Sequence, residues 1–219
     1  MEFQLHDLHF SDTVPLASSK RHDELYEDEL EATAVDLKES TSARWKLTVT
    51  VFGRTRDGRD VAVHVHGFRP ELYYDAKIDL ETVREHFTSA HDKRIRGSVV
   101  SRYNAGDLTM DDAGVRQPQR YLRVTFDHLF MYRKALYDEQ LPAHHTAPPL
   151  ESKFFQATGL QPSAWVRLDV SSKTCVRATV FATHCNAEFE AEIGDVTHVE
   201  SDDAAPLVAC AFDIESVSE

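Results

Sequence analysis

Alternation of hydrophobic and polar residues divides most of this chain into short β-strands. Residues 45–52, W-K-L-T-V-T-V-F, alternate and are rich in β-branched side chains, and residues 61–67 resume the pattern after Asp57 and Gly58. An Asp-Gly pair between two such runs is typical of a tight β-hairpin. The same criterion predicts further strands at residues 3–10, 72–75, 97–103, 121–126, 165–170, 175–183 and 187–192.

Two segments show helical periodicity instead. Residues 79–89 place Leu80, Val83 and Phe87 on one face of an amphipathic helix, and residues 127–139 form a second helix with Asp127 as its N-cap. The order strand, helix, strand, strand, helix, strand over residues 72–170 is that of a ferredoxin-like unit, and the flanking strands would complete a small barrel. We therefore expect an α+β fold that is rich in β-structure.

Residues 18–41 interrupt this pattern. They are polar, acidic and only weakly periodic, so that a helix over residues 24–37 and an irregular insertion are both open. We favour a partly ordered acidic loop or insertion.

The charge of the chain is strongly acidic. It has 24 Lys and Arg against 37 Asp and Glu, a net charge of −13. Residues 22–40 hold eight acids against Lys38 alone, and ten acids but no Lys or Arg follow Arg177. A freestanding nucleic-acid-binding protein normally carries a basic face, and this balance argues against one.

Cysteine usage and hydropathy indicate the compartment. Cys175, Cys185 and Cys210 are odd in number and form no C-x-x-C pair, which predicts buried free thiols in a reducing, intracellular compartment. No stretch approaches the ~18 apolar residues of a membrane span, and the polar N-terminus is unlike a signal peptide. We expect no membrane partner.

The last residues hold the strongest candidate for chemistry. Residues 206–215 read P-L-V-A-C-A-F-D-I-E, an apolar run with the length of a strand buried on both faces. Residues i and i+2 of a strand share a face, so Asp213 and Glu215 point to the same side. Two carboxylates leaving a buried strand need a positive partner, and Mg²⁺ or Mn²⁺ serves there in phosphoryl chemistry. The alternative is a strand end whose carboxylates are hydrated.

This strand and an upstream stretch resemble one family. Residues 209–216, A-C-A-F-D-I-E-S, resemble the first exonuclease motif of family B DNA polymerases. Residues 53–74, G-R-T-R-D-G-R-D-V-A-V-H-V-H-G-F-R-P-E-L-Y-Y, resemble the N-terminal domain of the delta-type and large-DNA-virus enzymes, as do residues 1–12 and, less sharply, residues 159–168. Glu71 and Leu72 depart from the aromatic run that the family more often has after the proline.

The resemblance implies a domain organisation and a parent activity. Residues 1–203 would be a polymerase N-terminal domain, with oligonucleotide-binding-like strands and an RNA-recognition-like unit, and residues 204–219 the first strand of an RNase H-like exonuclease domain. Asp213 and Glu215 would bind Mg²⁺ or Mn²⁺ for 3′–5′ proofreading. The complete enzyme would act on DNA template, primer and dNTPs with a sliding clamp and accessory subunits, at a nuclear or viral replication site. The family's remaining carboxylates lie downstream, so we expect this segment to be inactive alone.

Aromatic and basic residues define an alternative function. Tyr74, Tyr103 and Tyr121 lie on the predicted ferredoxin-like sheet, where aromatic rings can stack on single-stranded bases. Arg54 and Arg56 flank the hairpin turn, where they either contact a phosphate or solvate the turn. On this interpretation the chain is a stand-alone, non-catalytic module that binds single-stranded nucleic acid or another protein.

A pair of histidines is a candidate for metal binding. His64 and His66, at i and i+2, share a strand face and could ligate an ion, although no third ligand is suitably spaced. We favour the alternative, in which both face the surface while Val63 and Val65 point inward.

Overall fold

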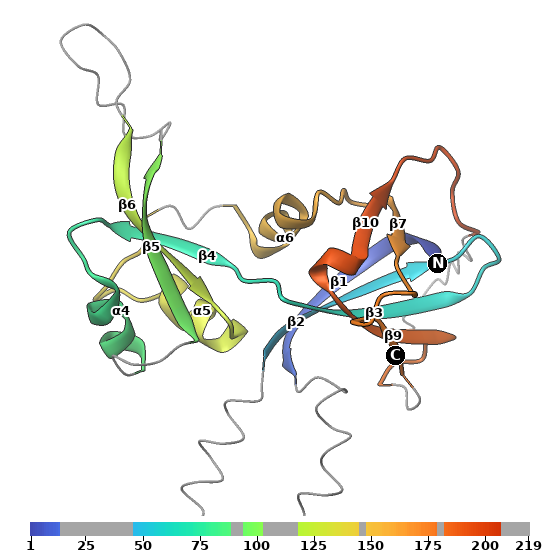
Figure 1. Cartoon of the computed structure of the whole chain (residues 1–219), viewed down its shortest axis with the longest axis horizontal. Coiled ribbons are helices and arrows are strands. Elements are labelled where there is room, and N and C mark those ends of the chain that lie inside the picture. The colour runs from blue at the N-terminus through green and yellow to red at the C-terminus, as the bar shows by residue number, and fades with distance from the viewer. Residues whose placement is uncertain (14–45, 89–93, 103–117, 145–147, 179–181, 207–219) are drawn as a thin grey trace, which may run out of the picture.

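The strands form two sheets in the computed structural model, which describes residues 1–13, 46–88, 94–102, 118–144, 148–178 and 182–206. The two sheets lie at opposite ends of the molecule in Figure 1, with helix α6 between them. The larger is a curled seven-stranded sheet in the order β10-β7-β1-β2-β3-β9-β8. Its strands are β1 (Glu2–Thr13), β2 (Lys46–Arg54), β3 (Asp60–His66), β7 (Trp165–Leu168), β8 (Val176–Arg177), β9 (Ala187–Glu192) and β10 (Val196–Val199).

The predicted hairpin of β2 and β3 lies at the middle of the larger sheet. Its strands pair antiparallel, and β9 adds to β3 in parallel. Val49, Val51 and Val63 are fully buried on one face, as alternation requires. The predicted strands at residues 3–10, 45–52, 61–67 and 187–192 are thereby confirmed. Strand β10 was not predicted, and residues 179–181 of the strand expected at 175–183 lie outside the described part of the chain.

Gly53 permits the close approach of β1 to β2. A Cβ at this position would collide with the ring of Phe3 and the carbonyl oxygen of Gln4. The strand pairing shifts register between Leu5 and Asp7, opposite this glycine. The glycine that begins the G-R-T-R-D-G stretch is therefore required by packing.

The smaller sheet has three antiparallel strands in the order β4-β6-β5. They are β4 (Glu71–Asp75), β5 (Ile95–Arg102) and β6 (Gln119–Phe126), and helices α4 (Leu80–Phe87) and α5 (Leu129–Leu136) accompany them. The side chain of Asp79 caps α4 by accepting from the amide of Thr82 at 2.7 Å. Both predicted helices are confirmed, each shorter than expected.

The fourth strand predicted for this unit is not part of the smaller sheet. Residues 165–168 form β7, which pairs with β1 and β10 in the larger sheet. At the outer edge of β4 there is instead a single bridge, in which the amide of His144 donates to the carbonyl of Tyr73 at 2.6 Å. The unit thus has the predicted β-α-β-β-α order, but its expected last strand, β7, pairs instead with β1 at the start of the chain.

The N-terminus of α5 is capped from another element. Asp127 was predicted as the N-cap, which is wrong: its carboxylate pairs with Arg69 at 2.6 Å and with Arg96 at 3.4 Å. The carboxylate of Asp12, at the end of β1, instead accepts from the amides of Leu129 at 2.7 Å and Phe130 at 3.0 Å. Because β1 belongs to the larger sheet and α5 accompanies the smaller one, this cap connects the two sheets.

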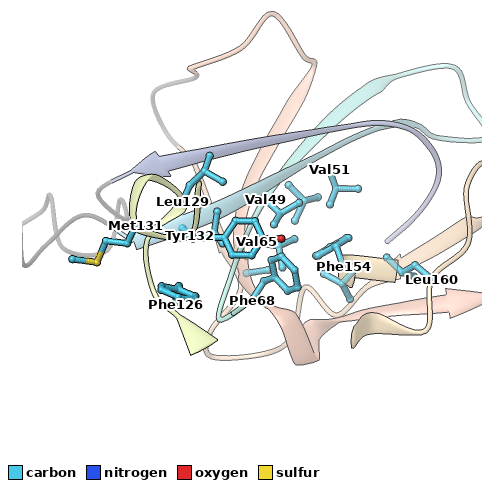
Figure 2. Packing of buried hydrophobic residues seen from close by; sticks show 14 of the residues in the cluster. Val49, Val51, Val65, Phe68, Phe126, Leu129, Met131, Tyr132, Phe154 and Leu160 are labelled. Carbon is cyan, nitrogen blue, oxygen red and sulfur yellow. The ribbon is translucent and has the colours of Figure 1, made fainter. Parts of the chain in front are cut away.

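Helix α6 (Leu150–Thr158) was not predicted, and it joins the cores of the two sheets. Phe154 packs edge-on against Phe68, with ring centroids 5.4 Å apart, and near Phe10 at 6.3 Å. Figure 2 shows Phe154 and Phe68 within one continuous cluster that reaches Tyr132 of α5. The hydrophobic core therefore extends across both sheets.

Lys153 on the same helix is buried in this junction. Its ammonium group donates to the carbonyl oxygen of Glu71 at 2.8 Å and to the hydroxyl of Tyr132 at 3.1 Å. Burial lowers the pKa of Lys153, and the nearby charge of Glu71 opposes this change. Burial also raises the pKa of Tyr132 to about 12.

The cysteines that the structure describes are free thiols. Cys175 and Cys185 are both half-buried and unpaired, while Cys210 lies outside the described residues. Burial is the main cause that raises the pKa of Cys175, which favours the protonated thiol.

Candidate functional site

The structure describes residues 201–206, which precede the predicted metal ligands in the chain. Asp213, Glu215 and Tyr103 lie outside the described residues. The chain is described as far as Pro206, and residues 201–206 run against the hairpin that carries Arg54 and Arg56. Residues 201–206, which directly precede the apolar run with Asp213 and Glu215, therefore contact the hairpin of the upstream stretch.

Two arginines of the hairpin hold residues 201–206. The guanidinium of Arg54 donates to the carbonyl oxygen of Pro206 at 3.1 Å and forms an ion pair with Asp60 at 3.2 Å. The guanidinium of Arg56 forms an ion pair with Asp203 and donates to the hydroxyl of Ser201 at 3.2 Å. Sequence reasoning singled out both arginines, but their partners lie about 150 residues away along the chain.

Trp165 and Gln4 complete this arrangement. The indole Nε1 of Trp165 donates to the carbonyl oxygen of Asp203 at 2.6 Å, and the guanidinium of Arg56 lies 4.2 Å from the centroid of its ring. The side-chain oxygen of Gln4 accepts from the buried amide of Ala205 at 2.8 Å. We call Gln4, Arg54, Arg56 and Trp165 the terminal anchor, because they hold residues 201–206 in place.

The turn of the hairpin explains the motif that carries these arginines. The amide of Thr55 donates to the carbonyl of Arg59 at 2.9 Å, and the Thr55 hydroxyl accepts from the amide of Arg59 at 3.0 Å. Gly58 has a positive φ of 82°, which favours glycine. Hydrogen bonds from Thr55 and Arg59 lower the pKa of the Asp57 carboxyl. The turn thus positions Arg54 and Arg56, two residues apart, on the side of residues 201–206.

Two of the three tyrosines proposed to stack on bases, Tyr74 and Tyr121, are buried. Tyr74 is completely buried, and burial is the main cause that raises its pKa. Tyr121 is also buried, donates its hydroxyl to Gln119 at 2.6 Å and packs against Tyr73 and His144. Base stacking needs an exposed ring face, and neither side chain presents one in this structure.

The open face of the smaller sheet carries cations that sequence reasoning did not single out. Arg96 and Arg102 on β5 and Arg123 on β6 share the face opposite the helices, and about half of each side chain is exposed. Arg102 lies over the ring of Tyr73 at 4.5 Å and 3.6 Å from the carboxylate of Glu71. The spacing of Arg96 and Arg102 within the strand at residues 95–102, which places both on one face, was the signal that could have identified them.

His64 does not face the solvent, which corrects the sequence prediction. Its Nδ1 lies 2.9 Å from the hydroxyl of Thr50, and its Nε2 lies 2.5 Å from the carboxylate of Glu188. The other oxygen of Glu188 accepts from the amides of Ala182 and Thr183 at 2.9 and 3.3 Å. The pair joins β3 to β9 within a satisfied hydrogen-bond network.

His66 lies two residues further along β3, in a similar arrangement. Its Nδ1 lies 3.2 Å from the hydroxyl of Thr48, and its Nε2 lies 3.6 Å from the carboxylate of Glu190. Both members of this pair are buried. In the described part of the chain, no group of three or more His, Cys, Asp or Glu side chains could hold a metal ion. The two histidines of the H-x-H pattern on β3 thus each face an acid of the E-x-E pattern on β9.

Comparison with solved structures finds a distant likeness to the family B DNA polymerase from the hyperthermophilic archaeon Pyrobaculum calidifontis. The TM-score is 0.49 and the sequence identity 16%, and the match covers 93% of this chain. It covers 21% of the archaeal chain, so this chain spans about a fifth of that protein's length. No protein-family model matches the sequence, and no curated protein matches it.

None of the helices that the structure describes is long and apolar enough to span a membrane.

Proposed function

We propose that this chain is the N-terminal segment of a replicative family B DNA polymerase of the delta or large-DNA-virus type. In this proposal residues 1–203 are a scaffold, and residues 204–219 begin the 3′–5′ proofreading exonuclease. Asp213 and Glu215 are its first metal ligands. The remainder of the enzyme supplies the other acids and binds the template, the primer and dNTPs.

The observation that supports this proposal most is the terminal anchor. Arg54 belongs to the G-R-T-R-D-G stretch, and Pro206 is the first residue of P-L-V-A-C-A-F-D-I-E. A hydrogen bond of 3.1 Å joins them, and Arg56 and Trp165 both hold Asp203 three residues earlier. The hairpin of the upstream stretch thus holds the backbone up to the residue that opens the apolar run, which supports a scaffold role for residues 1–203.

The chemistry proposed for the motif depends on this fixed starting point. Divalent ions held by Asp213 and Glu215 would polarise the scissile phosphate and lower the pKa of the attacking water. Ions in two-metal sites lie only ~3.5–4 Å apart, so the carboxylates that hold them must be placed accurately. Two carboxylates without further ligands leave Mg²⁺ mostly hydrated, and the segment alone should be inactive.

The coding DNA after codon 219 and an assay of the longer chain test this proposal. We expect the reading frame to continue into an N-x-x-x-F-D-like segment. In that longer chain, Asp213→Ala should abolish Mg²⁺-dependent degradation of a labelled primer while primer extension continues. Asp202→Ala, which removes an exposed acid near the same segment, is the matched control. Unchanged primer degradation by the Asp213→Ala enzyme would contradict the assignment.

A module that binds single-stranded nucleic acid is the second candidate, favoured by the open face with Arg96, Arg102 and Arg123. Binding of a labelled oligonucleotide of about 12 nucleotides, measured by fluorescence anisotropy at ~0.15 M salt, distinguishes the two. Tight binding that is lost in Arg102→Glu and retained in Arg59→Glu, at the hairpin, would support this alternative.

A further inference from the structure

Helix α5 exposes one face of aromatic and basic side chains. Phe130 and Tyr137, at the helix start and its C-cap, are 73% and 78% exposed, and Arg133 and Lys134 between them are exposed too. Positions i, i+3, i+4 and i+7 lie on the same side of a helix. We call these four residues the α5 stripe. The opposite side of the helix, with Leu129, Met131, Tyr132 and Ala135, is buried against the smaller sheet.

The composition of the α5 stripe is that of a binding surface. Single exposed apolar side chains are common, but these are two aromatic rings about two helical turns apart with two cations between them. Aromatic residues and arginine are the types most enriched where proteins bind one another. The larger part of each ring is exposed to solvent in this structure.

The charge of the stripe contrasts with that of the chain. Residues 129–136 contain two cations and no acid, in a protein with a net charge of −13. Among the described residues, neither Arg133 nor Lys134 has an ion-pair partner; the Lys134 ammonium lies 5.8 Å from the ring centroid of Phe87. The neighbouring acid Asp138 pairs with His86 at 3.0 Å. The two cations are therefore available to an external acid.

We propose that the α5 stripe is a docking surface for an acidic amphipathic helix of a partner protein. Its rings are separated by seven residues, or ~10 Å along the helix axis. An antiparallel or parallel helix repeats its apolar positions with the same spacing, and acids between those positions would meet Arg133 and Lys134. Nucleic acid fits less well, because a convex helix offers no groove that could follow a phosphate backbone.

Synthetic peptides test this proposal on the whole chain. The probe is a labelled helical peptide of about 20 residues, with Leu at i and i+7 and Glu at i+3 and i+4, whose binding is followed by fluorescence anisotropy. A peptide with every Glu replaced by Lys is its control. We expect the acidic peptide alone to bind, and the double variant Phe130→Ala/Tyr137→Ala to weaken binding about tenfold or more.

Two further variants complete the experiment, one that reverses the charge of the stripe and one that serves as a control. Arg133→Glu/Lys134→Glu should abolish binding of the acidic peptide and create binding of the basic one. Val170→Ala, which shortens an exposed apolar side chain following β7, should leave the affinity unchanged. All five substituted side chains are exposed, and unchanged thermal unfolding would confirm that each variant is folded.

Five outcomes would overturn the proposal. The first is that the acidic peptide does not bind, and the second is that the double variants bind it as well as the unchanged protein does. The third is binding of a single-stranded oligonucleotide that requires Phe130 and Tyr137, which would make the stripe a nucleic-acid surface.

The last two outcomes would identify an occupant within this protein. Dimerisation, seen in sedimentation and lost in Phe130→Ala/Tyr137→Ala, would mean that a second copy covers the stripe. Peptide binding only after deletion of residues 22–40 would mean that the protein's own acidic segment does.

Discussion

At the scale of residues, the buried charged groups serve as connections between elements. Lys153 reaches from α6 to the carbonyl of Glu71 and the hydroxyl of Tyr132, and Glu188 joins β9 to His64. A buried charge is costly unless it is satisfied, so such contacts depend on the whole surrounding fold.

Lys153 should make the stability of the protein increase with pH. Its pKa in the folded protein lies below the ordinary value of 10.5, so between these two values the unfolded chain binds more protons. The free energy of unfolding should therefore rise with pH across that window, relative to that of Lys153→Met. Urea unfolding of both proteins from about pH 7 to 10 measures this difference. A difference that stays constant with pH would contradict the lowered pKa.

At the scale of elements, the structure separates what local patterns determine from what distant contacts determine. Alternation and the Asp57-Gly58 turn predict β2 and β3 correctly, because side-chain burial on a strand repeats every two residues. The cap of α5 comes instead from Asp12, 117 residues away, and no local pattern contains it. Asp127 has the right residue type at the right place, but Arg69 and Arg96 take its carboxylate.

The candidate site shows the same division. The sequence identifies Arg54 and Arg56 as notable cations beside a turn, but their acceptors at Pro206, Asp203 and Ser201 are set by the fold. The burial of Tyr74 and Tyr121 also depends on packing that the β-period alone does not specify. The sequence therefore predicts which residues matter at this site, but not which residues they contact.

Removing the remote cap should destabilise α5 measurably. Asp12→Ala leaves the amides of Leu129 and Phe130 without their carboxylate acceptor and should lower the free energy of unfolding by about 1 kcal/mol. Asp12→Asn keeps one side-chain oxygen and should cost less. Asp7→Ala, on the exposed part of β1, is a matched control. Equal losses for Asp12→Ala and Asp7→Ala in chemical denaturation would refute the capping role.

At the scale of the whole molecule, the two sheets share a single core through α6. Phe154 is fully buried between Phe10 and Phe68, and the buried cluster runs from Val49 to Phe126 (Figure 2). The sheets should therefore unfold together, in contrast to two domains joined by a linker.

Phe154→Ala tests this shared core. The substitution should lower the free energy of unfolding by about 3 to 5 kcal/mol, because it leaves a cavity among aromatic rings. Intrinsic fluorescence, which reports on Trp45 and on Trp165 in the larger sheet, and far-ultraviolet circular dichroism should show one coincident transition. Phe155→Ala, on the less buried side of the helix, should cost less. Two separate transitions in the wild-type protein would mean that the sheets fold independently.

The order in which the strands pair has a consequence for synthesis of the protein. Strand β1 lies between β2 and β7, and β3 pairs with β9 more than 120 residues later. Such high contact order slows folding, because long loops must close before these pairings contribute. During translation the β2–β3 hairpin can form early, but its edge stays unpaired until residues 187–192 leave the ribosome. Nascent chains of intermediate length should therefore be the most prone to aggregate and the most dependent on chaperones.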